Sequence, residues 1–150
     1  MNIEERFLCS KCLREIATDE ICPFCGYNPT SEEDSSILEE GTLLHNGRYQ
    51  LGSVLGRGGF GITYAAWDLI LDMPVALKEY FPDSYATRNC AQSELITVID
   101  TEKLYYFLGL QTFVRESRAM ATLRNIESVV NVYDCFEENN TAYIVMEYVR

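Results

Sequence analysis

Residues 49–81 read YQLGSVLGRGGFGITYAAWDLILDMPVALKEYF, and this stretch decides the fold. A strand-like run is followed by a glycine-rich turn at residues 56–61 and then by the β-branched and aromatic run Ile62–Trp67. A dinucleotide-binding unit would place a helix after the glycines, and a Walker-type loop would end in Gly-Lys-Ser or Gly-Lys-Thr; neither pattern follows here. The glycines are therefore expected to join two antiparallel strands, either as a plain turn or as a loop whose backbone approaches phosphate groups.

A lysine ends the next apolar run, Val75-Ala76-Leu77-Lys78, seventeen positions beyond Gly61. An isolated lysine near the end of a strand is commonly a solvated edge residue. If Lys78 instead binds phosphate, it needs a carboxylate that holds its ammonium group in place. The second interpretation therefore requires an acidic partner farther along the chain.

Residues 102–124 supply a candidate, because their apolar side chains recur at helical spacing. One face of this helix is expected to carry Phe113, Glu116, Met120 and Leu123. An acid on an apolar stripe is costly without a partner, which favours an inward-facing cation, and Lys78 is the natural one. In the alternative, the stripe is partly exposed and Glu116 faces water.

Two further strands are expected over residues 129–137 and 141–149, joined by the short turn Glu138-Asn139-Asn140. Taken in order over residues 48–150, these features resemble the N-terminal lobe (N-lobe) of the eukaryotic-like Ser/Thr protein kinases of bacteria. The string Lys78-Glu79-Tyr80-Phe81-Pro82 is also similar to a subgroup whose lysine strand reads KEYFP. The resemblance implies an α+β fold, with an antiparallel five-stranded sheet, one long helix and an insert.

The resemblance also implies a site for ATP, with Mg in the complete kinase. By position, the cofactor-binding residues are Leu55, Gly56, Gly58, Gly61, Thr63, Ala76, Lys78, Met146, Glu147 and Val149. The three glycines would shape the loop over the phosphates. The adenine pocket would be lined by Leu55, Ala76 and Thr63, the last in place of the usual valine.

The last strand would end at the hinge between the two kinase lobes. Met146 falls at the gatekeeper position, and the carbonyl of Glu147 and the amide of Val149 would meet the adenine edge through the backbone. The HRDxxxxN loop and the DFG aspartate of a kinase do not occur in the 150 residues. Phosphoryl transfer to protein substrates would need a downstream C-lobe, so this chain alone is expected to be inactive.

Lys78 and Glu116 take the catalytic roles in this resemblance, as the phosphate-binding lysine and its paired acid. Met120 and Val132 match apolar positions that link the helix to the sheet. This role differs little from that of ordinary residues of the hydrophobic core. Lys78 and Glu116 are 38 positions apart, longer than a usual N-lobe allows. The extra residues, 82–101, are expected to contain a strand at 95–99 and are interpreted as a feature of the subgroup. The alternatives are a docking site for a regulator or a device that displaces the helix.

Four of the six cysteines form two CxxC pairs separated by nine residues: Cys9, Cys12, Cys22 and Cys25. Four thiolates select zinc over hard cations and leave no open coordination position, which predicts a structural zinc ribbon. Gly26 follows the second pair, where a positive φ turns backbone N–H groups toward sulfur. Iron and a redox CxxC are the alternatives, although four-cysteine iron sites have other spacings and redox pairs lie in a βαβ unit. Cys90 and Cys135 are expected to be a loop thiol and a buried small hydrophobe.

The acidic charge is concentrated in one stretch of the chain. Residues 28–47 carry five acidic side chains and no lysine or arginine, nearly half of the net charge of −11. Such a polar stretch is more typical of a solvated linker than of an acidic recognition tail. The predicted organisation is a zinc ribbon at 1–27, an acidic linker at 28–47 and an N-lobe at 48–150.

Composition excludes several classes of protein. A content of 47% hydrophobic residues excludes collagen-like and wholly disordered chains. No apolar run approaches the ~18 residues of a membrane helix, and no signal-peptide core is present, so no membrane contact is expected from this segment. A sequence pI of about 4.5 argues against nucleic acid as a partner. Six cysteines without an export signal indicate a cytoplasmic location.

Two functions of different class remain open. In the first, the chain is the N-terminal part of a Ser/Thr protein kinase that uses ATP and acts on protein substrates. In the second, it is a standalone zinc-ribbon and nucleotide-pocket module that acts in regulation or protein interaction without catalysis. The first is favoured, because an N-lobe without a C-lobe would expose an apolar face.

Overall fold

The computed structural model describes residues 7–9, 12–16, 21–26, 34–123, 126–127 and 129–149. The helices and strands are β1 (Phe7–Leu8), β2 (Glu15–Ile16), β3 (Leu43–Leu44), β4 (Tyr49–Arg57), β5 (Gly61–Asp68), β6 (Met73–Tyr80), β7 (Ala86–Thr87), β8 (Thr97–Val98), the 3-10 turn Asp100–Glu102, α1 (Lys103–Ala121), β9 (Val132–Glu138) and β10 (Thr141–Glu147). Residues 28–33 of the expected linker lie outside the described residues.

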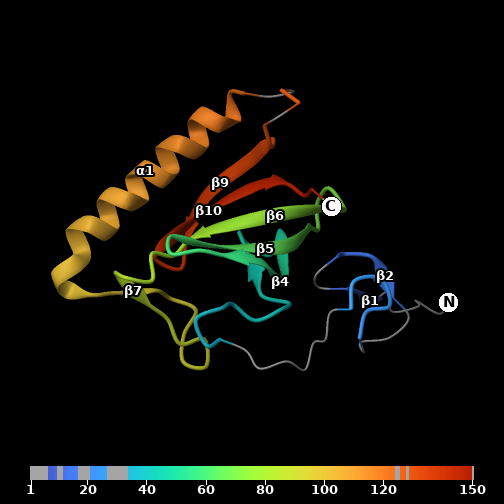
Figure 1. The fold of residues 1–150 in the computed structure, drawn as a ribbon, viewed down its shortest axis with the longest axis horizontal. Coiled ribbons are helices and arrows are strands. Elements are labelled where there is room, and N and C mark those ends of the chain that lie inside the picture. The colour runs from blue at the N-terminus through green and yellow to red at the C-terminus, as the bar shows by residue number, and fades with distance from the viewer. Residues whose placement is uncertain are drawn as a thin grey trace.

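The main sheet is antiparallel and has the strand order β3-β4-β5-β6-β10-β9. Its five long strands are those expected from the sequence, and the two-residue β3 adds a sixth at one edge. The sheet curls, and α1 runs along one side of it (Figure 1). The predicted α+β class is therefore confirmed.

The two faces of the sheet follow from the two-residue period of a strand. On one face, Ile62, Tyr64, Val75 and Leu77 of the central strands are fully buried in the core. The intervening residues of β5 and β6 point to the other face, where Thr63 is half-buried and Lys78 is exposed, whereas Ala65, Ala76 and Tyr80 are buried. The strands thereby separate a structural face from a second face that is accessible at Thr63 and Lys78, which we call the open face.

The β9–β10 hairpin turns on two residues with positive φ, Asn139 at 55° and Asn140 at 62°. A two-residue turn with positive φ at both positions matches the right-handed twist of the flanking strands, and asparagine tolerates this conformation. The turn lies where the sequence predicts it.

Residues 34–47 are packed against the sheet, in contrast to the solvated linker expected there. Leu38 and Leu44 are each 1% exposed and belong to the hydrophobic core, and β3 pairs with β4. The buried leucines belong to two apolar pairs, Ile37-Leu38 and Leu43-Leu44, within an acidic stretch. This stretch is too short to show a hydrophobic period. The solvated spacer therefore does not extend over residues 34–47.

Helix α1 and the insert also differ in detail from expectation. The buried side chains of α1 are Tyr106 and Ser117, whereas Glu116 and Leu123 are exposed. Of the expected stripe, Phe113 packs against the core and Met120 is half-buried, so the contact face keeps these two residues and has Ser117 in place of Glu116. In the insert, the expected strand at 95–99 is reduced to Thr97–Val98, which pairs with β7.

Candidate functional site

Cross-strand register brings four of the predicted site residues together on the open face of the sheet. Thr63 lies opposite Lys78, and in the next row Ala65 lies opposite Ala76. Ala76 is in turn paired with Met146 on β10. Directly paired residues on one face have Cβ atoms about 5 Å apart. Thr63, Lys78, Ala76 and Met146 therefore form one continuous patch over three strands.

The glycine-rich loop closes this patch at one end and is held by backbone hydrogen bonds. The Gly58 N–H donates to the Gly61 carbonyl at 2.9 Å, and the Phe81 N–H donates to the Phe60 carbonyl at 3.0 Å. A third bond, 3.2 Å long, runs from the Asp83 N–H to the Gly59 carbonyl. The loop tip is thus fastened to the segment that follows the lysine strand.

Space beside the glycines fits a ligand that approaches the backbone. No heavy atom lies within 4 Å of the point where a Cβ atom of Gly56 or Gly58 would be. Glycine is the residue that allows the closest approach to the main chain. The open space leaves room for a ligand close to the main chain at Gly56 and Gly58.

The remaining predicted contacts lie at the margins of the patch. Leu55 is 40% exposed at the end of β4, and Val149 is 68% exposed just beyond β10. The Glu147 N–H donates to the Asn131 carbonyl at 2.8 Å, which fixes the backbone as β10 ends. These positions leave the end of β10 accessible for backbone contacts with a planar ligand.

Lys78 and Glu116 line the same cavity but form no ion pair within 4.0 Å in the described part of the chain. The cavity has a volume of about 410 Å³ and lies between the loop tip, β6 and α1, with Phe60, Tyr80 and Phe113 among its walls. Glu116 is exposed, so burial does not force it to find a cation. The separation leaves both charged groups available to a ligand or to a movement of α1.

Helix α1 packs against β9 and β10, and Ser117 makes a polar contact with β9. The Ser117 hydroxyl donates to the Val114 carbonyl at 2.7 Å and lies 3.3 Å from the Cys135 sulfur. Met120 is half-buried on α1 and Val132 is 2% exposed on β9. Cys135 is half-buried at this contact.

The four N-terminal cysteines form a compact cluster. Their sulfur atoms lie within 4.8 Å of one another, with Cys9 and Cys25 at 3.6 Å and Cys12 and Cys22 at 3.8 Å. Tetrahedral zinc with Zn–S bonds of about 2.3 Å separates its sulfurs by about 3.8 Å. The observed distances match that geometry, so the donor set fits zinc.

Two equivalent turns present these thiols. The Leu13 N–H donates to the Cys9 carbonyl at 2.8 Å, and the Gly26 N–H donates to the Cys22 carbonyl at 2.9 Å. The residue after each CxxC pair has a positive φ, 59° at Leu13 and 76° at Gly26, which confirms the conformation expected at Gly26. Each knuckle therefore closes in the same way.

The environment of Cys22 favours its thiolate. Burial raises the pKa of the Cys22 thiol, but N–H groups of Cys25 and Phe24 and the thiols of Cys9 and Cys25 outweigh it and lower the pKa to about 6. The Phe24 N–H lies 3.4 Å from the Cys22 sulfur. A thiolate is the form that binds a metal.

A buried ion pair that was not predicted from the sequence lies beside Lys78. Glu79 is 0% exposed, and Arg88 of the insert donates to both of its carboxylate oxygens, at 2.8 and 2.6 Å. The two-residue period of β6 places Glu79 on the buried face, so the sequence carried a signal for a buried acid. It carried no signal for its partner, because the segment around Arg88 has no periodic pattern.

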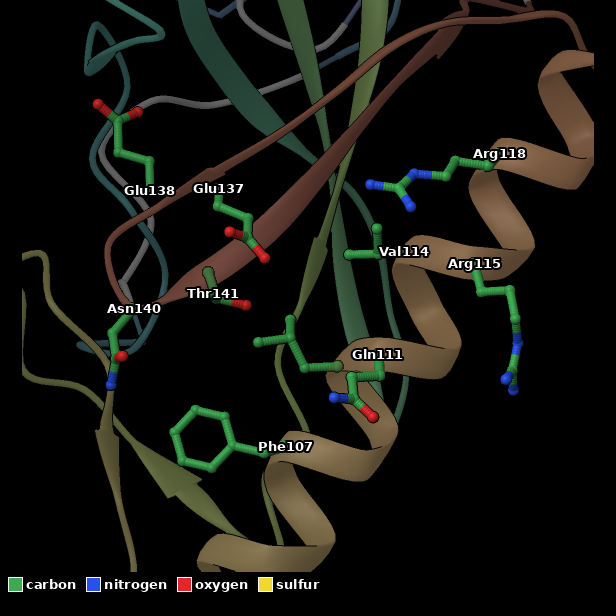
Figure 2. A pocket seen from close by; sticks show the side chains of 10 residues that line it. Phe107, Gln111, Val114, Arg115, Arg118, Glu137, Glu138, Asn140 and Thr141 are labelled. Carbon is green, nitrogen blue, oxygen red and sulfur yellow. The ribbon is translucent and has the colours of Figure 1, made fainter.

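A second cavity, of about 820 Å³, lies between α1 and the β9–β10 hairpin (Figure 2). Arg115 and Arg118 lie on its helical wall, and Glu137 and Glu138 lie on the wall opposite. None of the predicted site residues lines it. The candidate nucleotide site is therefore assigned to the open face of the sheet.

Within the described residues, α1 does not combine the length and the apolarity that crossing a bilayer requires. No protein-family model matches the chain.

Comparison with known proteins points to one group. The chain is 31% identical over 109 residues to Serine/threonine-protein kinase B of Synechocystis sp., an alignment that covers 73% of this chain and 17% of that protein. It is 38% identical over 105 residues to Serine/threonine-protein kinase PrkC of Bacillus subtilis, which covers 70% of this chain and 13% of that protein. The solved apo form of PpkA-294 matches with a TM-score of 0.69 and 31% identity, over 76% of this chain and 39% of that one. The chain spans less than a fifth of these two curated relatives, and over its N-lobe region its homologues are bacterial Ser/Thr protein kinases.

Proposed function

We propose that the lobe formed by residues 34–149 is the ATP-binding part of a bacterial Ser/Thr protein kinase. The observation that carries this proposal is the patch of Thr63, Lys78, Ala76 and Met146, registered over three strands beneath a loop with open space at its glycines. An apolar surface for adenine next to a cation and free backbone space for phosphates is what a bound nucleotide needs.

Each predicted residue has a role in this site. Lys78 binds the phosphates, and Glu116 pairs with it when α1 approaches the sheet. Gly56, Gly58 and Gly61 shape the loop above them. ATP would supply the phosphoryl group, with Mg neutralising its charge. The protein's part is to orient the nucleotide and to exclude water.

The adenine end is formed by apolar side chains and backbone. Leu55, Thr63, Ala76 and Met146 line the ring, and the Glu147 carbonyl and the Val149 amide meet its edge. The motifs that supply the catalytic aspartates in the kinase family do not occur in these 150 residues. The chain is thus expected to bind nucleotide and to leave phosphoryl transfer to protein Ser/Thr to a further lobe.

The four-cysteine cluster would hold one structural zinc ion. Cys9, Cys12, Cys22 and Cys25 supply all four ligands, which leaves no position for a substrate. So small a module buries too little apolar surface to fold by itself, and zinc would supply the missing free energy. Its role is structural.

Titration calorimetry with Mg-ATP tests the nucleotide site. The substitution Lys78→Met should weaken binding at least ten-fold, because it removes the phosphate-binding cation and leaves the strand intact. Lys103→Met is the matched control, since Lys103 forms an ion pair with the exposed Asp100 just before α1, and the variant should bind like wild type. Equal affinity of the Lys78→Met variant and the wild type would refute the assignment. Submicromolar binding by the chain alone would instead favour a standalone nucleotide-binding module.

A further inference from the structure

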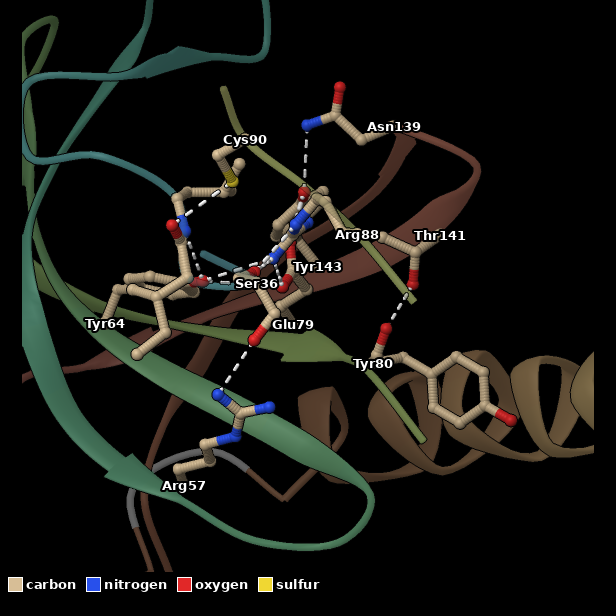
Figure 3. A network of polar contacts seen from close by, with 12 residues as sticks. Ser36, Arg57, Tyr64, Glu79, Tyr80, Arg88, Cys90, Asn139, Thr141 and Tyr143 are labelled. Atoms are coloured by element: carbon tan, nitrogen blue, oxygen red, sulfur yellow. Dashed lines mark hydrogen bonds and ion pairs between the residues drawn. The ribbon is translucent and has the colours of Figure 1, made fainter. Parts of the chain in front are cut away.

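Glu79 is held by a network on the face of the sheet opposite Lys78 (Figure 3). Besides the two bonds from Arg88, its carboxylate accepts a hydrogen bond of 2.6 Å from the Tyr143 hydroxyl. Asn139 donates to that same hydroxyl at 3.0 Å. Every buried side-chain polar atom in the described residues has a partner, so this network is complete.

Arg88 also binds a segment far from the lysine strand. Its Nε and Nη2 atoms donate to the Ser36 carbonyl at 2.8 and 2.6 Å. One guanidinium thus joins Glu79 on β6 to Ser36, although its side chain is fully buried. A planar fork with five N–H donors can make both connections at once, which a lysine cannot.

We define residues 34–38 as the strap. The Cys90 N–H donates to the Ser35 carbonyl at 2.9 Å, and the Leu38 N–H donates to the Tyr64 hydroxyl at 3.1 Å. Leu38 is buried in the core. The strap therefore lies over the structural face of the sheet and is fastened to both the insert and β5.

The strap also contacts the glycine-rich strand. Arg57, between Gly56 and Gly58, forms an ion pair with Asp34 and donates to the Ser36 hydroxyl at 2.9 Å. Ser36 thus accepts a hydrogen bond from Arg57 on its hydroxyl oxygen and hydrogen bonds from Arg88 on its carbonyl oxygen. The two strands that carry the phosphate-binding groups are linked through one residue of the strap.

The network around Arg88 fixes the positions of Glu79 and the strap more than it adds to the free energy of unfolding. A buried ion pair gains little net free energy, because desolvation of both charges offsets their attraction. It does fix geometry: in a strand, holding Glu79 inward holds Lys78 outward. The second connection, to Ser36, ties the same point to the glycine-rich strand.

We propose that Arg88 is a positioning residue of the nucleotide site: through Glu79 it orients Lys78, and through Ser36 and the strap it sets the glycine-rich strand against the lysine strand. This inference rests on the proposed nucleotide function. The insert therefore contributes to ATP binding from the face of the sheet that ATP does not touch.

Matched arginine-to-lysine substitutions test the proposal. Arg88→Lys keeps a charge beside Glu79 and loses the fork that reaches Ser36. The expected result is a folded protein whose Mg-ATP dissociation constant rises about ten-fold and whose Leu38 and Cys90 amides exchange faster by NMR. Arg48→Lys is the control: Arg48 pairs with Asp68 at the far end of β5, and affinity should stay within two-fold of wild type.

Each result decides between a positioning and a purely structural role. Unchanged affinity in Arg88→Lys, with or without faster strap exchange, would overturn the proposal. If the wild type itself binds no Mg-ATP, the proposed function fails. The link from Arg88 to the loop is then tested by hydrogen exchange of the Phe81 and Asp83 amides, which hold the loop tip. Faster exchange of these amides in Arg88→Lys supports the link, and unchanged exchange refutes it.

Discussion

Gly61 begins β5 at a point where the neighbouring strand β6 leaves no room for a side chain. A Cβ atom there would lie 2.8 Å from the Glu79 carbonyl oxygen, closer than such atoms approach in proteins. The corresponding point at Gly58 has no atom within 4 Å. Glycine at position 61 is thus required by the fold, whereas glycine at position 58 is required only if a ligand fills the space.

Alanine substitutions separate these two requirements. Gly61→Ala should lower the free energy of unfolding by about 1–3 kcal/mol, because β5 must move away from the β6 backbone. Gly58→Ala should stay within about 0.5 kcal/mol of wild type in urea unfolding and weaken Mg-ATP binding. A Gly61→Ala variant as stable as wild type would show that the two strands can separate without loss.

The sequence predicts the elements with long patterns and misses those held by single contacts. The strands β4, β5 and β6 follow from apolar runs around the glycines. The strap does not, because Leu38 belongs to an isolated apolar pair among acids, and the strap is bonded to Tyr64 and Arg88, both distant in sequence.

In helix α1, the apolar spacing predicts the helix correctly but does not predict all of its buried face. Residues 102–124 were predicted as helical, and α1 covers Lys103–Ala121. The apolar pattern placed Glu116 inside, whereas the fully buried position is its neighbour Ser117, whose hydroxyl bonds back to Val114. A hydrophobic period does not detect a buried serine, so it assigned the inward position to Glu116 while Phe113 of the same stripe does pack against the core.

A glycine fixes how closely α1 approaches β6. A Cβ atom at Gly109 would lie 2.2 Å from the Tyr80 hydroxyl oxygen, which donates to the Tyr106 carbonyl at 2.9 Å. Gly109→Ala gains about 1 kcal/mol of helix propensity, yet we expect a net loss of stability, because Tyr80 must abandon its hydrogen bond.

A double-mutant cycle checks this contact. In a Tyr80→Phe background the hydroxyl is absent, so Gly109→Ala should destabilise by at least about 1 kcal/mol less than in the wild type. Urea unfolding of the four proteins gives the coupling directly. Equal effects in the two backgrounds would mean that the hydroxyl does not limit the approach of the helix.

The whole molecule contains two structures that are stabilised in different ways. The lobe has a continuous hydrophobic core, whose described members run from Ile37 to Val145. The four-cysteine module contributes no residue to that core within the part of the chain described. Its described order consists of the β1–β2 pairing, two short turns and a four-cysteine cluster whose donor set fits one metal ion.

Metal removal should therefore separate the two parts. We expect about one zinc ion per chain by elemental analysis, and a strong chelator should collapse the amide spectrum of the cysteine module. The lobe should keep its melting temperature within about 2 °C, since a change of 1 kcal/mol would already shift it by several degrees. Cys22→Ser should lose the zinc, whereas Cys90→Ser should keep it, because Cys90 bonds instead to the Ile37 carbonyl. A lobe that melts with the module on chelation would show that the metal supports the nucleotide site as well as its own ligands.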